Sequence, residues 1–177
     1  LTSDIFSYNP RIKITSYSDK PVTYRDASKK SRTANEDYFG IIRLKENRRD
    51  IQIILELYVS RTGSPAKTFT VYRSGNDRFS NGIRRLSSML NEALPIVGKL
   101  INRYQNEAVI DIGKHDSDFK GLKIAVIRKD RLVIEKEGLG MVFDPSDLLG
   151  YFEPSKSEEN LSEGILKRNG YYDRMNA

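Results

Sequence analysis

The sequence predicts an α+β fold in which a curved antiparallel β-sheet packs against a long helix kinked at Pro95. Residues 51–59 alternate Ile, Leu and Val with mostly polar residues, which is the pattern of a strand with one buried face. Short polar turns connect these residues to strand-like runs on both sides, and such turns favour antiparallel pairing over parallel crossovers. From Phe79 to Tyr104, apolar residues recur at steps of three and four, which indicates a helix that buries one side.

Residues 10–73 are expected to form a basic sheet. Residues 11–17 alternate cations and a tyrosine with isoleucines, which predicts a first strand with a cationic outer face, and residues 22–25 predict a short return strand. Residues 26–35 lack apolar periodicity and hold three cations within four positions, so they are expected to form a mobile basic loop. The three strands of the central meander are expected at 38–45, 50–60 and 67–73.

A helix at 77–104 is expected to cover the apolar face of this sheet. Pro95 cannot donate a helical hydrogen bond, so the helix should kink near Leu94 or stop there and restart. A second group of strands at 108–143 and a short helix at 145–151 follow, which gives the chain two strands-then-helix halves.

Residues 1–152 are expected to form a single domain around one core, because 177 residues are few for two domains of ordinary size. Residues 153–177 are rich in Ser, Glu and Lys and carry only a small apolar motif. We expect them to form a flexible tail that docks on its own domain, on a neighbouring subunit or on another protein.

The composition excludes several classes of function. The chain has no cysteine, which excludes disulfides, thiolate catalysis and cysteine-ligated zinc. The lack of cysteine also favours a reducing compartment such as the cytoplasm, or the cytoplasm of the host cell if the protein is viral. The only histidine, His115, lies in a run with Asp116, Ser117 and Asp118 that is typical of a solvated loop rather than of a catalytic triad or a cation site. Dinucleotide and phosphate-loop motifs are absent, and no apolar run reaches the roughly 18 residues of a membrane span. We therefore expect a protein that is not an enzyme, needs no cofactor or metal, and has no membrane partner.

The net charge of +6 is unevenly distributed along the chain. Residues 10–73 hold 14 Lys and Arg against 7 Asp and Glu, whereas residues 74–152 hold 12 against 11. A concentrated basic surface attracts polyanions through counterion release and steers their approach. An uneven charge that only keeps the protein soluble is the alternative explanation.

Aromatic residues share the predicted strands with these cations. Proteins that hold single-stranded nucleic acid combine cations that contact phosphates with rings on which the bases stack. Because strands also favour aromatic residues for packing, part of the rings must fill the core. By alternation, two groups of side chains should each face together, namely Arg11, Lys13 and Tyr17, and Phe39, Arg43 and Lys45.

The sequence therefore predicts a nucleic-acid-binding surface on the N-terminal sheet and the basic loop. Its candidate residues are Arg11, Lys13, Tyr17, Arg25, Lys29, Lys30, Arg32, Phe39, Arg43, Lys45, Tyr58, Arg61, Lys67 and Arg73.

Two short segments carry a resemblance to a known group of proteins. Residues 93–98, Ala-Leu-Pro-Ile-Val-Gly, are similar to the Leu-Pro-containing helix of Whirly proteins, and residues 120–124, Lys-Gly-Leu-Lys-Ile, resemble their Lys-Gly-Lys strand motif. With two successive groups of strands followed by a helix, the basic, cysteine-free chain resembles the Whirly and PUR groups of single-stranded nucleic-acid-binding proteins. The order departs from that of Whirly proteins, in which the strand motif precedes the helix, and Leu122 interrupts the motif. The resemblance implies a sheet that meets the nucleic acid and helices that pack the core, and it transfers no site residue.

Two functions of different classes stay open. The first is the binding of single-stranded DNA or RNA without catalysis. The second is an interaction or assembly component, for example of a virus or phage, whose basic face and tail engage protein partners. Edge strands such as residues 11–17 need protection, which pairing between subunits would provide, so a homo-oligomer is expected as well. Strong salt dependence of oligonucleotide binding would favour the first function, and high-order oligomers unaffected by nuclease would favour the second.

Overall fold

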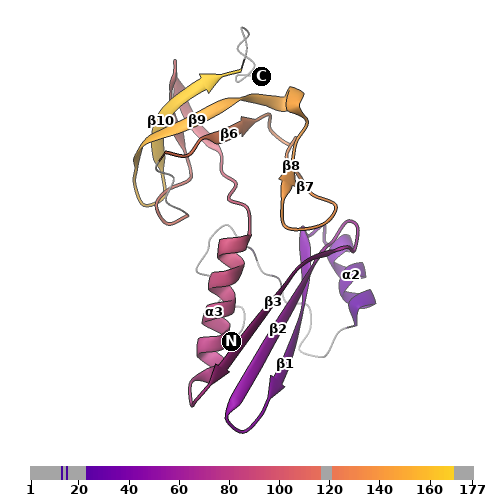
Figure 1. Ribbon diagram of the computed structural model, residues 1–177. Coiled ribbons are helices and arrows are strands. Elements are labelled where there is room, and N and C mark those ends of the chain that lie inside the picture. Colours follow the sequence, from indigo (N-terminus) through magenta and orange to yellow (C-terminus); the bar gives the residue numbers. More distant parts are fainter. Residues whose placement is uncertain (1–12, 14, 16–22, 117–120, 170–177) are drawn as a thin grey trace. The chain divides into compact units, whose positions relative to one another are not determined.

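The computed structural model describes residues 13, 15, 23–116 and 121–169, and these residues combine helices with antiparallel sheets (Figure 1). The chain divides into two compact units, which are described one at a time. Unit 1 comprises Leu1–Leu94 and Ile134–Gly140, and unit 2 comprises Pro95–Val133 and Met141–Ala177. The predicted α+β class is confirmed. The prediction of a single core differs from the structure, because each unit has a hydrophobic cluster of its own. No helix in the described ranges combines the length and the apolar character needed to cross a membrane.

The sheet of unit 1 is a three-stranded antiparallel meander. Its strands are β1 (Tyr38–Glu46), β2 (Asp50–Val59) and β3 (Pro65–Ser74), in the order β1-β2-β3. The three predicted strands are therefore confirmed. Along β2 every second residue is buried, as the alternation of apolar and polar residues requires.

Helix α3 (Arg78–Ala93) covers one face of this sheet, over β2 and β3. Gly82 allows the close approach, because a Cβ atom there would lie 2.7 Å from Cδ1 of Ile53. Each fully buried aliphatic side chain in this layer contributes about 1.5 to 3 kcal/mol of hydrophobic stabilisation. The buried core of unit 1 consists of Ile51, Ile53, Leu55, Leu57, Phe69, Val71, Ile83, Leu86, Leu90 and Leu139.

The predicted long helix kinked at Pro95 is not found. Leu94, the residue before the proline, is extended, with φ −77° and ψ 141°, and ends α3. Proline disfavours the helical conformation of the residue that precedes it, so the helix stops and does not bend. The apolar spacing continues, but residues from Leu100 to Tyr104 form strand β4 and not a continuation of the helix.

A second helix, α2 (Tyr24–Thr33), replaces the return strand predicted at 22–25 and the mobile loop predicted at 26–35. Thr23 caps it, since its side chain accepts a hydrogen bond from the Asp26 amide at 3.2 Å. Lys30 and Arg32 lie in the last turn, where cations complement the helix dipole. Only two of its residues, both serines, are buried, so no apolar stripe marks this helix in the sequence.

Unit 2 contains a curled five-stranded antiparallel sheet in the order β4-β5-β10-β9-β6. Its buried core consists of Ala108, Ile110, Ile112, Phe152 and Leu166. Two short strands, β7 (Val133–Ile134) and β8 (Met141–Val142), pair only with each other, at the two points where the chain passes between the units. The five strands of the sheet are β4 (Leu100–Tyr104), β5 (Glu107–Ile110), β6 (Ile124–Ile127), β9 (Leu148–Ser157) and β10 (Ser162–Arg168).

Two further predictions for this part of the chain differ from the structure. The helix predicted at 145–151 is only the single 3₁₀ turn Pro145–Asp147, after which β9 begins. The predicted tail at 153–177 instead contains the end of β9 and the whole of β10, joined by a turn at 158–161, and residues 170–177 lie outside the described residues. In β10 the buried residues Ser162, Gly164 and Leu166 alternate with exposed ones, and Gly164 fits where a Cβ would collide with the Glu153 carbonyl. Because Ser162 and Gly164 are small, the sequence shows no strong hydrophobic alternation here, and this strand was not predicted.

Candidate nucleic-acid interface

The sheet of unit 1 has a second face, opposite to α3, which we call the open face. Cross-strand partners share a face, so the register assigns the residues directly. Lys45 is opposite Gln52, and Gln52 is opposite Tyr72, so these three side chains form one row across the sheet. The open face consists of Phe39, Ile41, Arg43, Lys45, Asp50, Gln52, Ile54, Glu56, Tyr58, Thr68, Thr70, Tyr72 and Ser74.

Helix α2 covers the aromatic end of the open face. The Phe39 and Tyr58 rings stack with centroids 5.1 Å apart, and Tyr24 of α2 lies edge-on at 5.4 Å and 5.0 Å from them. The Tyr24 hydroxyl donates a hydrogen bond to the Gly63 carbonyl at 2.6 Å, which fixes the helix there. Phe39 is consequently only 7% exposed, and Tyr58 is half-buried. Phe39 therefore offers no ring for base stacking in this structure.

Arg43 and Lys45 lie together on the open face, and both are exposed. Nη2 of Arg43 is 3.1 Å from Oε2 of Glu56, so part of its charge is neutralised. The Tyr58 hydroxyl donates a hydrogen bond to the same carboxylate oxygen at 3.3 Å. The pKa of Tyr58 is raised, first by burial and further by Glu56. Lys45 has no ion-pair partner within the described part of the chain and is the freer of the two cations.

Other predicted cations lie off the open face. Lys67 and Arg73 belong to the α3 side of β3, where the Lys67 ammonium lies 5.4 Å from the centroid of the Phe69 ring. Arg73 is half-buried and donates from Nη1 to the Tyr72 carbonyl at 2.8 Å. Arg61, in the turn after β2, donates from Nη2 to the Ile134 carbonyl at 3.2 Å.

The three cations predicted in the loop, and the one predicted at the end of the return strand, are exposed on α2 instead. They are Arg25, Lys29, Lys30 and Arg32, and Arg32 also donates from Nε to the Ser28 carbonyl at 3.3 Å. Lys13 is exposed, whereas Arg11 and Tyr17 lie outside the described residues. The predicted set is therefore divided between the two faces of the sheet, a turn and a helix.

Sequence reasoning missed Tyr72, which is the most exposed ring of the open face at 58%. Its hydroxyl is hydrogen-bonded to Asp50, which raises the pKa of Tyr72. The alternation Thr68, Thr70, Tyr72 was visible in the sequence, but the pairing of β3 with β2 was needed to put Tyr72 in the same row as Lys45.

The net positive charge of the chain belongs entirely to unit 1, because the charges of unit 2 cancel. The residues of unit 1 include 18 Lys and Arg against 12 Asp and Glu, whereas unit 2 has 12 of each.

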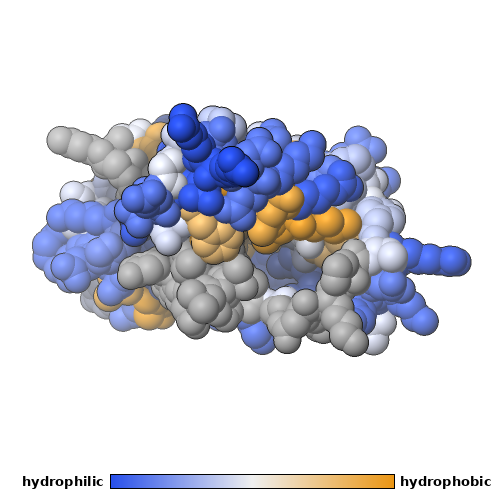
Figure 2. Space-filling view, turned by 90° about the horizontal axis from the view of Figure 1, so that it is seen from below, coloured by the Kyte–Doolittle hydropathy of each residue, from blue (hydrophilic) through white to orange (hydrophobic). Residues whose placement is uncertain are grey.

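Figure 2 shows a surface composed mainly of hydrophilic residues, with an area of hydrophobic residues among them. In the described part of unit 1, the exposed large apolar and aromatic side chains are Tyr24, Ile42, Leu44, Tyr72 and Phe79.

His115 and Asp116 of the polar run lie in a loop of unit 2, whereas Ser117 and Asp118 lie outside the described residues. His115 is exposed, and its Nε2 lies 3.9 Å from Oε2 of Glu159. The Gly113 amide donates to Asp116 at 2.9 Å, so this carboxylate closes a local turn. Across the described ranges, no cluster of three or more His, Asp or Glu side chains could hold a metal ion.

Comparison with known proteins relates the N-terminal half of the chain to a protein family. No curated protein and no solved structure matches the chain. A family model described as the second domain of the TPASS_0648 family matches residues 1–92, just over half of the 177 residues. The match includes β1, β2 and β3 and ends inside α3, close to Leu94, where the first segment of unit 1 ends. The matched segment thus contains the sheet of unit 1 and nearly all of α3, and the chain belongs to the TPASS_0648 family.

Proposed function

We propose that unit 1 binds single-stranded DNA or RNA, without catalysis, on the open face of its sheet. The row formed by Lys45, Gln52 and Tyr72 carries this proposal, because it combines a free cation with the most exposed ring of that face. In this arrangement Lys45 and Arg43 contact phosphates, Gln52 hydrogen-bonds a base edge or a sugar, and Tyr72 stacks on a base.

The location of the charge supports the same proposal. All of the net charge of +6 belongs to unit 1, and the exposed cations of α2 extend the basic surface beyond the sheet. Attraction of a polyanion to such a surface is sequence-independent and strongly dependent on salt. With α3 on one face of the sheet, a strand bound on the other face would follow the arrangement that the resemblance to the Whirly and PUR groups implies.

Fluorescence anisotropy with labelled single- and double-stranded oligonucleotides at several salt concentrations tests the proposal. Arg43→Ala with Lys45→Ala should lower the slope of log K against log salt by about 1.4, since each lost phosphate contact on a single strand removes about 0.7. Tyr72→Ala should weaken binding about 5- to 150-fold, corresponding to about 1 to 3 kcal/mol per stacked base, and leave the slope unchanged.

Two controls keep this experiment specific. Tyr72→Phe retains the ring but loses the hydrogen bond to Asp50, so it should bind like the native protein if stacking matters. Lys129→Ala with Arg131→Ala removes the same charge from unit 2 and should leave binding unchanged. Equal weakening by the unit 1 and unit 2 charge variants would contradict the proposal, because it would mean that only net charge matters.

A second function, an assembly component, is favoured by one observation. Ile42 and Leu44 of edge strand β1 are 44% and 53% exposed on the side that α3 occupies over the neighbouring strands. Exposed apolar residues on an edge strand are typical of protein contacts. Nuclease-resistant oligomers in sedimentation, lost in Leu44→Lys, would support this function over nucleic-acid binding.

A further inference from the structure

A hollow in unit 1 lies between two neighbouring loops, the β1–β2 turn and the loop from β3 to α3. Its volume is about 270 Å³. The Gly75 amide donates a hydrogen bond to the Arg49 carbonyl at 3.1 Å, which ties the two loops together. Gly75 has a φ of +93°, a conformation that favours glycine. The hollow is lined by Arg48, Arg49, Asp50, Ser74, Gly75, Asn76 and Arg78.

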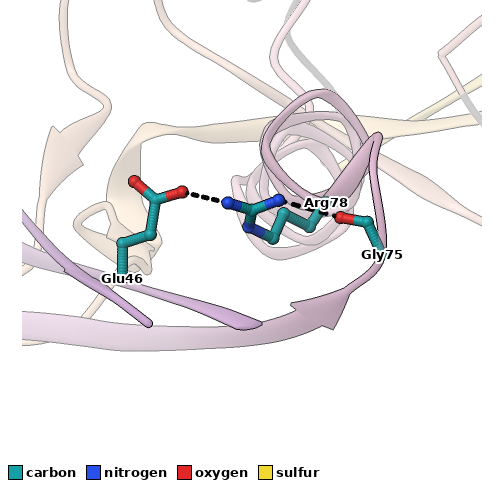
Figure 3. Close-up of polar contacts among 3 residues, drawn as sticks. All are labelled: Glu46, Gly75 and Arg78. Carbon is teal, nitrogen blue, oxygen red and sulfur yellow. Dashed lines mark hydrogen bonds and ion pairs between the residues drawn. The ribbon is translucent and has the colours of Figure 1, made fainter. Parts of the chain in front are cut away.

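Three arginines and one carboxylate line this hollow. Arg78 already has partners, because Nη1 donates to the Gly75 carbonyl at 3.1 Å and Nη2 donates to Oε1 of Glu46 at 2.5 Å (Figure 3). Asp50 is engaged by the Tyr72 hydroxyl. The exposed side chains of Arg48 and Arg49 have no hydrogen-bond or ion-pair partner in the described ranges, so two guanidinium groups beside the hollow are available to a ligand.

Helix α3 begins at the hollow and adds to its positive potential. Asp77, at the N-cap, makes no side-chain hydrogen bond to the first turn, and the first turn contains no acidic residue. The amide groups of that turn therefore have no side-chain cap, and the helix dipole leaves a partial positive charge there. Arg78, the first residue of the helix, adds a cation where helices usually favour anions, so a bound anion would relieve this unfavourable arrangement.

We propose that this hollow binds a phosphate group, with Arg48 and Arg49 as its principal ligands. The planar guanidinium matches two phosphate oxygens at once, and a phosphate dianion suits a site with two unpaired arginines. The Ser74 hydroxyl and the Asn76 amide line the same hollow and can supply further hydrogen bonds. The hollow contains neither Lys45 nor Tyr72, although Tyr72 contacts its lining residue Asp50, and phosphate binding there does not require nucleic-acid binding by the open face. Its phosphate comes either from the end of a polynucleotide or from free phosphate.

Titration of the ¹⁵N-labelled full chain with inorganic phosphate, followed by amide chemical shifts, tests the site. The amides of Gly75, Asn76 and Arg78 should shift saturably, and potassium chloride at matched ionic strength should not reproduce these shifts. Arg48→Ala with Arg49→Ala should raise the phosphate dissociation constant by about tenfold or more, as expected for lost hydrogen bonds to a charged group.

The matched control is Arg84→Ala with Arg85→Ala, an adjacent exposed pair further along α3, which should bind phosphate like the native protein. Well-dispersed spectra of both variants show that they fold. Absence of saturation, or equal weakening in the two double variants, would overturn the site.

Two oligonucleotides of one sequence, with a 5′-phosphate or a 5′-hydroxyl, distinguish the sources. Tighter binding of the phosphorylated form, lost in the Arg48 and Arg49 variant, assigns the phosphate to a polynucleotide end. Equal binding of both, with saturable inorganic phosphate, assigns it to free phosphate. Failure of the open-face proposal would appear instead as unchanged oligonucleotide binding in the Arg43 and Lys45 double variant, whose two residues do not line the hollow, with the phosphate titration unaffected.

Discussion

Gly82→Ala tests how closely α3 packs on the sheet. The added Cβ would lie 2.7 Å from Cδ1 of Ile53, a side chain that is fully buried. Replacing a helical glycine by alanine gains about 1 kcal/mol of helix propensity, whereas overpacking a core costs about 1 to 3 kcal/mol. The single substitution is therefore expected to destabilise unit 1 by about 0 to 2 kcal/mol.

Ile53→Val removes the methyl group that the new Cβ would meet. Alone it should cost about 0.5 to 1.5 kcal/mol, but in the presence of Gly82→Ala it relieves the overlap. The double variant should accordingly be more stable than the sum of the single effects predicts, by about 1 kcal/mol or more.

Amide hydrogen exchange in β2 measures these free energies for unit 1 by itself, which matters because a chain of two units need not unfold in one step. Additive effects of the two substitutions would refute the close contact between α3 and β2 from which the open face is assigned.

Two further predictions concern unit 2. Gly164→Ala should destabilise it by about 1 to 3 kcal/mol, because the new Cβ would collide with the Glu153 carbonyl; unchanged exchange rates in β9 and β10 would contradict this. Lys167, whose Nζ lies 2.6 Å from Oε2 of Glu153, together with Lys123, holds the pKa of that carboxyl below its usual value. The resulting stabilisation of the folded state is present above the pKa that Glu153 has in the unfolded chain. It is lost as the pH falls through the lower pKa that Glu153 has in the folded state. Thermal unfolding between pH 6 and pH 2 should show this loss in the native protein and a smaller loss in Glu153→Gln.

The sequence identified the elements whose patterns are local. Alternation along residues 51–59 and the short turns on both sides were sufficient to predict β1, β2 and β3. Helix α2 was missed because its stability comes from the Thr23 cap and the contacts of Tyr24, and its buried residues are serines. The predicted helix was wrongly extended beyond Leu94. Apolar residues continue to recur at steps of three and four there, although residues 100–104 form a strand.

The candidate site was predicted in part. Alternation correctly assigned Arg43 and Lys45 to one face, since this needs only the geometry of a single strand. Burial of Phe39 could not be foreseen, because it depends on a helix that packs from elsewhere in the chain. The position of Tyr72 beside Lys45 depends on the register of three strands, which no local pattern specifies.

The aromatic proton spectrum of Tyr72, recorded as a single-stranded oligothymidylate is added to the full chain, tests the central proposal most directly. Stacking predicts upfield ring-current shifts of the Tyr72 ring protons that saturate together with amide shifts at Lys45 and Gln52, while the covered Phe39 ring changes little. Saturating binding that leaves the Tyr72 ring unshifted, or that shifts only residues of unit 2, would contradict it.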